Sequence, residues 1–207
     1  MAMGLVRHLP FPDRRAAVRD VRDRVADVEG WLTDGEGALL YELARGNRGG
    51  AIVEIGSWKG RSTIWLAEGS RAGRGAVVVA IDPHTGSEEH RADGEVVDTF
   101  SEFRTNLAMA GVEEVVRPER AMSVDAAARV DEPVGLLFID GAHDRDSVLA
   151  DIDAWFPKLA PHGMIAFHDV TASWPGVARA IGERLVEPGR VDRLRFVHSI
   201  VYARKRA

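Results

Sequence analysis

The stretch "VEIGSWKGRST", Val53 to Thr63, decides the fold. It completes a continuous apolar run over residues 49–56 that is bounded by glycines. Such a run is too short for a helix and is typical of a strand buried on both faces. Beyond a second glycine, residues 61–71 have helical periodicity. Strand, glycine turn and helix in this order predict the start of a parallel α/β sheet.

The alternation continues to the end of the sequence. Strands are predicted at residues 76–83, 113–120, 134–141 and 163–170, helices at 98–111, 123–130, 146–160 and 177–189, and two closing strands within 192–206. A turn between the closing strands is expected near His198 and Ser199. The predicted fold class is α/β, with a Rossmann-like, doubly wound, mostly parallel seven-stranded sheet, helices on both faces and an antiparallel last strand.

Two helices are predicted before the first strand. Charged and apolar residues alternate at helical spacing over residues 13–31, and "TDGE", Thr33 to Glu36, matches a capping box that opens the next helix. The predicted division is an N-terminal helical extension over residues 1–46 and a single globular domain over 47–207.

Composition excludes several classes of function. The chain has 207 residues, a net charge of −5 and no basic block of the kind that binds nucleic acid. Without cysteine, disulfides, thiolate zinc sites and cysteine nucleophiles are excluded, so a metal must use oxygen or imidazole ligands. No signal-peptide core or membrane-length apolar run is present, so we expect a soluble cytoplasmic protein.

The spacing of the glycine turn argues against two common phosphate sites. A P-loop needs four residues between its glycines and a lysine after the second, whereas three residues separate Gly56 from Gly60 and Lys59 comes first. A dinucleotide fingerprint needs glycine two residues after Gly56, where bulky Trp58 stands.

Acidic residues beside the turn indicate a different ligand. The pattern is Glu54, one residue, Gly56, three residues, Gly60, and a carboxylate here suits an ammonium or sulfonium group. Asp82 ends the second predicted strand. Its spacing from Gly56 along the sequence is close to the one at which an acidic side chain binds ribose hydroxyls. The expected ligand therefore contains a nucleoside.

Three segments carry a family resemblance: "VEIGSWKGRSTIWLA", "VVAIDPH" and "LLFIDGAHDRDSVLADIDAWFPKLAPHGMIAFHDV". The chain resembles the class I S-adenosylmethionine-dependent methyltransferases over residues 31–170, within the branch of sugar and macrolide-glycoside O-methyltransferases. The resemblance implies that S-adenosylmethionine is held by Glu54, Gly56, Ser57, Gly60, Ser62, Asp82, Met122, Ser123 and Asp140. It places Asp82 on the ribose and residues 121–123 beside the adenine. The alternative is a tight turn without a ligand.

Two neighbouring strand ends carry polar residues that a core would not contain: Asp140 and His143 after one strand, and His168 and Asp169 after the next. Adjacent strands lie about 4.8 Å apart, so Asp140 and Asp169 could converge on one cation. In the resembling enzymes a divalent cation is held by three acidic residues here, and His168 replaces one of them. The predicted ligands are Asp140, His168 and Asp169, for Mg²⁺ or Mn²⁺, unless His168 points away and water completes the shell.

His143 is the predicted general base and, with Asp140, forms the predicted catalytic pair. Its ordinary pKa near 6.5 suits proton acceptance at neutral pH. The alternative is a capping or supporting residue bonded to a neighbouring carboxylate. Asp144 and Asp146 are expected as acids at a helix N-terminus.

The remaining aromatic and histidine residues are weaker candidates. Trp58 and Trp174 could stack on a ligand or anchor a turn. His84 begins a long loop, residues 84–98, which could close over the acceptor or the cofactor but is expected to be solvated. Two further tryptophans at helical spacing are predicted to lie in the core, Trp65 and Trp155.

The function that these features predict is metal-assisted O-methylation of a sugar, glycoside or oligosaccharide hydroxyl. A phenolic or other natural-product acceptor is the alternative within the class. A non-catalytic cofactor-binding partner of a biosynthetic complex and an iron oxygenase are the alternatives outside it. No nucleic-acid or membrane partner is expected, and homodimer formation is left open.

Overall fold

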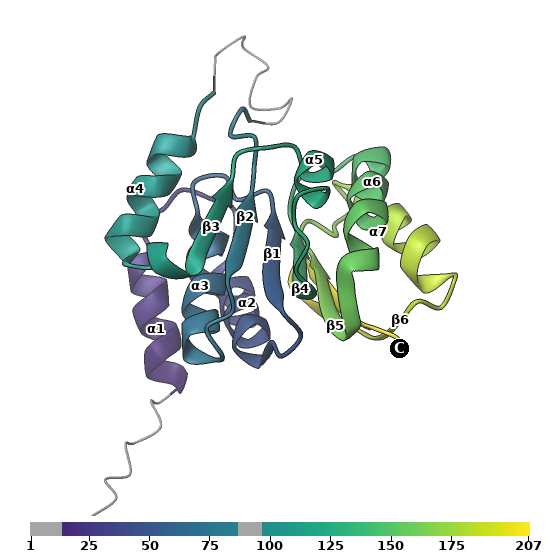
Figure 1. Ribbon diagram of the computed structural model, residues 1–207, viewed down its shortest axis with the longest axis horizontal. Helices are drawn as coiled ribbons and strands as arrows, with labels where there is room; N and C mark the ends of the chain where they lie inside the picture. Colours follow the sequence, from purple (N-terminus) through teal and green to yellow (C-terminus); the bar gives the residue numbers. More distant parts are fainter. Residues whose placement is uncertain (1–13, 87–96) are drawn as a thin grey trace, which may run out of the picture.

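A seven-stranded mixed sheet organises the computed structural model, which describes residues 14–86 and 97–207 (Figure 1). The sheet order is β3-β2-β1-β4-β5-β7-β6, and β7 runs antiparallel to both of its neighbours. The predicted fold is therefore confirmed, including the turn at residues 198–199. The strands are β1 (Ala51–Ile55), β2 (Val78–Ile81), β3 (Val116–Glu119), β4 (Val134–Ile139), β5 (Leu159–Phe167), β6 (Val191–Val197) and β7 (Ile200–Lys205).

The helices differ from the predicted ones mainly at their ends. The α-helices are α1 (Arg14–Arg24), α2 (Asp34–Gly46), α3 (Arg61–Ala72), α4 (Phe100–Ala110), α5 (Ser123–Ala127), α6 (Arg145–Trp155) and α7 (Pro175–Ile181). Short 3-10 helices, η2 (Glu113–Val115) and η3 (Phe156–Lys158), precede β3 and β5, and the π-helix η4 (Gly182–Val186) continues α7. In the described part of the chain, no helix has the length and apolar character needed to cross a bilayer.

Several predicted helices were too long, and two of them end early for an identifiable reason. The one expected over 146–160 stops at Trp155, because Pro157 cannot donate the backbone hydrogen bond that continues a helix, and β5 begins at Leu159. The one expected over 13–31 stops at Arg24. The chain then turns, and its freed carbonyl groups are bound by a side chain of α3 (below).

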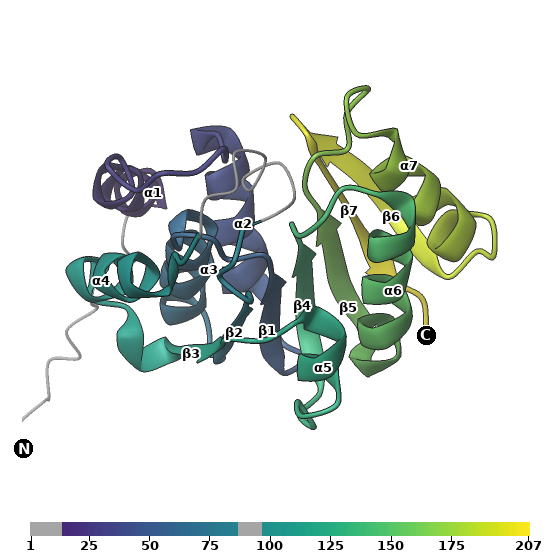
Figure 2. The ribbon, with the colours of Figure 1, turned by 90° about the horizontal axis from the view of Figure 1, so that it is seen from above.

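The strands separate two hydrophobic layers. Figure 2 shows α1 to α4 on one face of the sheet and α5, α6 and α7 on the other. Strand alternation sends Val53 and Ile55 toward the α5, α6 and α7 layer, whereas Ile52 packs with the helices of the opposite layer. The doubly covered sheet leaves its carboxyl ends as the place where polar side chains gather.

The N-terminal helices share the core of the main domain. Leu40 and Tyr41 of α2 are buried in the same cluster as Trp65 of α3. The guanidinium group of Arg61 donates hydrogen bonds to the carbonyl groups of Val25 (2.9 Å), Val28 (2.8 Å) and Leu32 (3.2 Å). This Arg61 clamp fixes the connection between α1 and α2 against the start of α3. The boundary at residue 46 stays a prediction.

Glu36 joins both ends of the fold. The predicted capping box is present: Glu36 Oε2 accepts hydrogen bonds from the Thr33 backbone (2.9 Å) and hydroxyl (2.7 Å). Its other oxygen accepts from the backbone (2.9 Å) and hydroxyl (2.6 Å) of Ser199, in the turn between β6 and β7. Only 1% of Glu36 is exposed, and it also lies 3.5 Å from His168 Nε2. One buried carboxylate therefore ties α2 to the C-terminal hairpin and to β5.

Substitution of Glu36 tests this junction. We expect Glu36→Ala to lower the free energy of unfolding by about 3 kcal/mol, because the donors of Thr33, Ser199 and His168 lose their buried acceptor. The control is Glu42→Ala on the same helix, which breaks only a partly exposed pair with Arg45 and should cost at most about 0.5 kcal/mol. Urea unfolding measures both, and equal costs would contradict the assigned role.

Gly56 is expected to be irreplaceable for steric reasons. Its φ is +86°, and a Cβ atom there would lie 2.0 Å from the backbone oxygen of Asp140. We expect Gly56→Ala to destabilise the protein by at least about 3 kcal/mol. Gly46→Ala at the end of α2, where a Cβ atom would meet nothing within 4 Å, should be neutral or stabilise by up to about 1 kcal/mol. Thermal unfolding compares the two variants, and similar melting temperatures would refute the steric argument.

Candidate active site

A cavity of about 800 Å³ lies at the carboxyl ends of β1, β2, β4 and β5. Its wall contains most of the residues predicted from the sequence: Gly56, Ser57, Ser62, Asp82, Met122, Ser123, Asp140, His143, His168 and Asp169. Two predicted residues, Glu54 and Gly60, are not part of this wall. The structure thus brings the glycine turn and the acid and histidine cluster into one space.

The glycine turn is held by Asp82. The Asp82 carboxylate accepts hydrogen bonds from the backbone N–H groups of Trp58 (2.8 Å) and His84 (2.6 Å). These bonds fix the carboxylate beside the turn, where Gly60 caps α3 in a left-handed conformation. A carboxylate fixed in this way can accept hydrogen bonds from the hydroxyl groups of a ligand without first having to be ordered.

Glu54 lies beneath the turn. Strand alternation points its side chain toward α3, where the hydroxyl groups of Ser62 and Thr63 hydrogen-bond to it. Complete burial raises the pKa of Glu54 to about 8, so the side chain is mostly protonated at neutral pH in the unliganded protein. Its direct contact with a cofactor stays a prediction, and Asp82 and Asp140 are the acidic groups that face the cavity from this side.

Four side chains converge where β4 and β5 end. His168 Nδ1 lies 3.1 Å from Asp140 Oδ1 and 3.1 Å from Asp169 Oδ2. His143 Nε2 lies 3.1 Å from the same oxygen of Asp169. Asp169 adopts a φ of +57°, a strained value for a residue other than glycine, and this brings its carboxylate between the two imidazoles.

The charges of this cluster balance around His168. Although burial favours a neutral ring, contacts with Asp140, Asp169 and Glu36 raise the pKa of His168 to about 12, so it is an imidazolium cation at neutral pH. The two histidines lower the pKa of Asp169, despite its partial burial. Burial raises the pKa of Asp140. His168 therefore offsets the negative charge of the carboxylates beside it.

His143 is positioned by an aromatic neighbour as well as by Asp169. Its ring stacks on Trp174 with the centroids 4.5 Å apart and an interplanar angle of 28°. Asp144, the next residue, is the N-cap of α6 and accepts from the backbone N–H groups of Asp146 (3.1 Å) and Ser147 (2.9 Å). The helix-capping role predicted for Asp144 is confirmed, and it anchors the loop that carries His143.

A divalent cation fits the donor set of this cluster. Ligand atoms of Asp140, His143 and Asp169 all lie within 4.8 Å of one another. Two carboxylate oxygens and one imidazole nitrogen suit Mn²⁺, and Mg²⁺ when water supplies further oxygen ligands. The predicted third ligand was His168, but its Nε2 faces Glu36 and its Nδ1 already contacts both aspartates. The geometry also allows His143 in that position, and His168 as a ligand stays a prediction.

Other parts of the cavity wall carry no motif that singles them out in the sequence. Trp31 is 65% exposed and its ring centroid lies 6.0 Å from that of Trp58, which also lines the cavity. Asp151 of α6 reaches the wall from the opposite layer. The sequence alone could have indicated Asp151, because it is an acidic residue between Leu149 and Ile152 on the buried side of an amphipathic helix.

The structure tests two further predictions, on the buried tryptophans and on His84, but not the one on the long loop. Trp65 and Trp155 are fully buried, as expected. The solvated environment expected for His84 is wrong: its ring is buried against Phe100 and Phe103, and its Nδ1 lies 2.9 Å from the hydroxyl of Thr99. Most of the predicted long loop, residues 87–96, lies outside the described residues.

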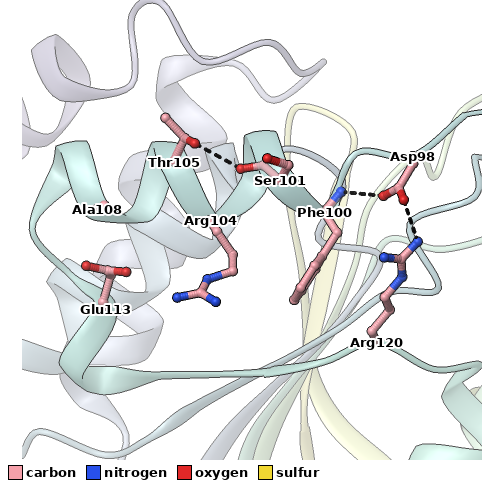
Figure 3. A pocket seen from close by; sticks show the side chains of 8 residues that line it. All are labelled: Asp98, Phe100, Ser101, Arg104, Thr105, Ala108, Glu113 and Arg120. Carbon is pink, nitrogen blue, oxygen red and sulfur yellow. Dashed lines mark hydrogen bonds and ion pairs between the residues drawn. The ribbon is translucent and has the colours of Figure 1, made fainter.

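A second hollow of about 520 Å³ lies along α4 and the end of β3. Figure 3 shows Phe100 and Arg104 extending from α4, with Arg120 opposite and paired with Asp98 at 2.8 Å. It shares no lining residue with the larger cavity among the residues described. It lacks the convergence of buried polar groups seen at the ends of β4 and β5, so the larger cavity is the candidate active site.

Comparisons with known proteins agree with this geometry. A protein of Mycobacteroides abscessus, provisionally named an O-methyltransferase, is 31% identical over 157 residues, 75% of this chain and 66% of its own length. The solved O-methyltransferase of Bacillus cereus in complex with SAH has a TM-score of 0.66 and 22% identity, covering 92% of this chain and 91% of that chain. TomG, an O-methyltransferase of Streptomyces achromogenes involved in tomaymycin synthesis and solved with SAM, has a TM-score of 0.64 and 21% identity, covering 92% and 90%.

This chain spans between 15% and 66% of the length of the curated relatives named for comparison. The family assignment rests instead on a sequence profile. The profile of the family described as "Methyltransferase domain" matches residues 53–170, more than half of the chain. The chain therefore belongs to the methyltransferase-domain family, with the class I fold that its motifs predicted.

Proposed function

We propose that the protein is an S-adenosylmethionine-dependent O-methyltransferase. The observation that carries this proposal is the single cavity in which the glycine turn and Asp82 face the cluster of Asp140, His143 and Asp169. The first pair suits a nucleoside cofactor, and the second suits a hydroxyl group that must lose its proton. The names of the relatives and the cofactors in the solved neighbours support the same activity.

The cofactor would lie along the turn and past β2. In this proposal Ser57 and Ser62 contact the methionine end, Asp82 the ribose and Met122 with Ser123 the base; all five line the cavity. Glu54 and Gly60 would support the turn from outside the wall. This order directs the sulfonium toward Asp140 and the cluster around it.

In the proposed reaction, the imidazole of His143 takes the proton of the acceptor hydroxyl. Asp169 stabilises the imidazolium that forms, since its carboxylate lies 3.1 Å from His143 Nε2, and stacking on Trp174 holds the ring plane. The acceptor oxygen forms a bond to the methyl carbon as the bond from that carbon to sulfur breaks, which leaves S-adenosylhomocysteine. Alignment of the two reactants in one cavity supplies part of the rate.

A divalent cation, Mg²⁺ or Mn²⁺, would be held by Asp140 and Asp169, with water completing its shell. When bound, it would stabilise the negative charge that develops on the acceptor oxygen. Water in the remaining positions leaves His143 free to accept the proton, and coordination of the cation by His143 would end its role as the base. Charged His168 is itself a source of positive charge beside the two aspartates.

The proposed acceptor is a sugar, glycoside or oligosaccharide hydroxyl. Trp174 and Trp31 in the wall support it, because aromatic faces pack on the apolar face of a sugar ring. The same side chains would also hold a phenolic ring, which remains the alternative acceptor. The polar cluster argues against a cofactor-binding protein without turnover. A cytoplasmic location stays a prediction, and homodimer formation stays open.

A transfer assay with a chelator tests the proposed chemistry. Purified protein is incubated with methyl-labelled S-adenosylmethionine and panels of sugars and phenols, with and without EDTA. We expect transfer to a hydroxyl that stops with EDTA and returns with added Mg²⁺ or Mn²⁺. Transfer that is indifferent to EDTA would remove the cation from the mechanism. Binding of S-adenosylhomocysteine without transfer to any acceptor would support the non-catalytic alternative, and bound iron would support an oxygenase.

The role of His143 is tested by its removal. We expect His143→Ala to lower kcat by at least about 100-fold, the usual contribution of a general base, with little change in the affinity for S-adenosylhomocysteine. His162→Ala, on the exposed early part of β5, is the matched control and should keep full activity. Steady-state kinetics and calorimetry measure the two quantities. Full turnover by His143→Ala would end its assignment as the base.

A further inference from the structure

Asp151 is a buried acid in the cavity wall that the proposed transfer does not use. It lies on the second turn of α6 and is only 7% exposed, yet it contributes to the cavity. Burial raises the pKa of its carboxyl to about 6, although a hydrogen bond from Ser123 acts in the opposite direction. A carboxylate buried in such a place needs hydrogen-bond donors to remain ionised.

The Ser123 hydroxyl, the hydrogen-bond donor to Asp151, has a fixed orientation. The indole N–H of Trp155 can only donate, and it does so to Ser123 Oγ at 2.9 Å. The Ser123 hydroxyl therefore accepts from Trp155 and has its own hydrogen to donate to Asp151, to which it is hydrogen-bonded. A carboxylate accepts several hydrogen bonds, so Asp151 keeps acceptor capacity for a donor in the cavity.

The wall around Asp151 suits a flat ring. Gly141 has no side chain, and a Cβ atom there would lie 3.7 Å from Asp151 Oδ2. Ala150 is small, and Met122 and Val124 add apolar surface to the same wall. Ser123, the partner of Asp151, follows β3, which lies next to β2 and its ribose-binding candidate Asp82. A base attached to a ribose at Asp82 can therefore extend toward Asp151.

We propose that Asp151 accepts a hydrogen bond from the exocyclic amino group of the cofactor's adenine and makes the site selective for adenine over a 6-oxopurine. Adenine presents an amino donor at this position, whereas hypoxanthine presents a carbonyl oxygen whose lone pairs would face the carboxylate. Ser123, oriented by Trp155, positions Asp151 for this contact. The inference rests on the proposed cofactor, because it assigns one more residue of the same site.

The test compares two cofactor products on two matched variants. Calorimetry gives the dissociation constants of S-adenosylhomocysteine and S-inosylhomocysteine, which differ at the 6-position of the purine. The variants are Asp151→Asn and Asp153→Asn. Asp153 lies on the same helix but pairs with Arg184 on the exposed side and is not part of the cavity wall. Thermal unfolding without ligand shows whether either change alters the fold.

The wild-type protein should bind the adenosyl compound at least about 10-fold more tightly than the inosyl compound. Asp151→Asn should weaken adenosyl binding by about 10- to 100-fold and remove or reverse the preference, because an amide N–H can donate to the 6-carbonyl. Asp153→Asn should leave both constants unchanged.

Two results would overturn the assignment of Asp151. One is a wild-type protein that binds the two compounds equally, which applies even where Asp151→Asn fails to fold. The other is a folded Asp151→Asn variant that keeps the wild-type preference, which would leave Asp151 a purely structural role. A wild-type protein that binds neither compound would instead refute the proposed cofactor, so the two failures are distinguishable.

Discussion

The buried contact between Glu36 and His168 is the interaction on which the site depends. The Glu36 side chain cannot swing out of the interior without leaving the donors of Thr33 and Ser199 unpaired, so its negative charge stays buried. That charge holds one edge of the His168 ring, and the other edge then faces Asp140 and Asp169. The carboxylates of Asp140 and Asp169 can lie close together because the positively charged ring of His168 contacts both of them. Glu36 of α2 thus contributes to the electrostatics of the candidate active site.

Much of the fold follows from local pattern. The apolar runs of β1 and β4 are buried along their whole length, so hydrophobicity alone identifies them, and the capping box defines the start of α2. The limits of α1 and α6 were harder to predict for two reasons. Pro157 ends one helix locally, but the clamp of Arg61 acts on carbonyl groups about 30 residues earlier in the chain. Interactions of that range leave no periodic signal.

The site was predictable where position along a strand determines it. Asp82, Asp140 and Asp169 follow strand ends, and parallel strands bring such ends to one edge. How deeply a side chain beside these strand ends is buried was not predictable. Glu54 is one residue inside β1, and strand alternation turns it toward α3 instead of the cavity. His84 is enclosed by two phenylalanines of α4, which the sequence places in a separate element.

The link from Glu36 to Ser199 has a consequence for biosynthesis. The two residues are separated by 163 positions, yet they share one carboxylate. The ribosome synthesises α2 long before the turn between β6 and β7. Until Ser199 has been synthesised, Glu36 lacks half of its final hydrogen-bond donors. The buried junction around Glu36 is therefore complete only after the turn between β6 and β7 has been synthesised.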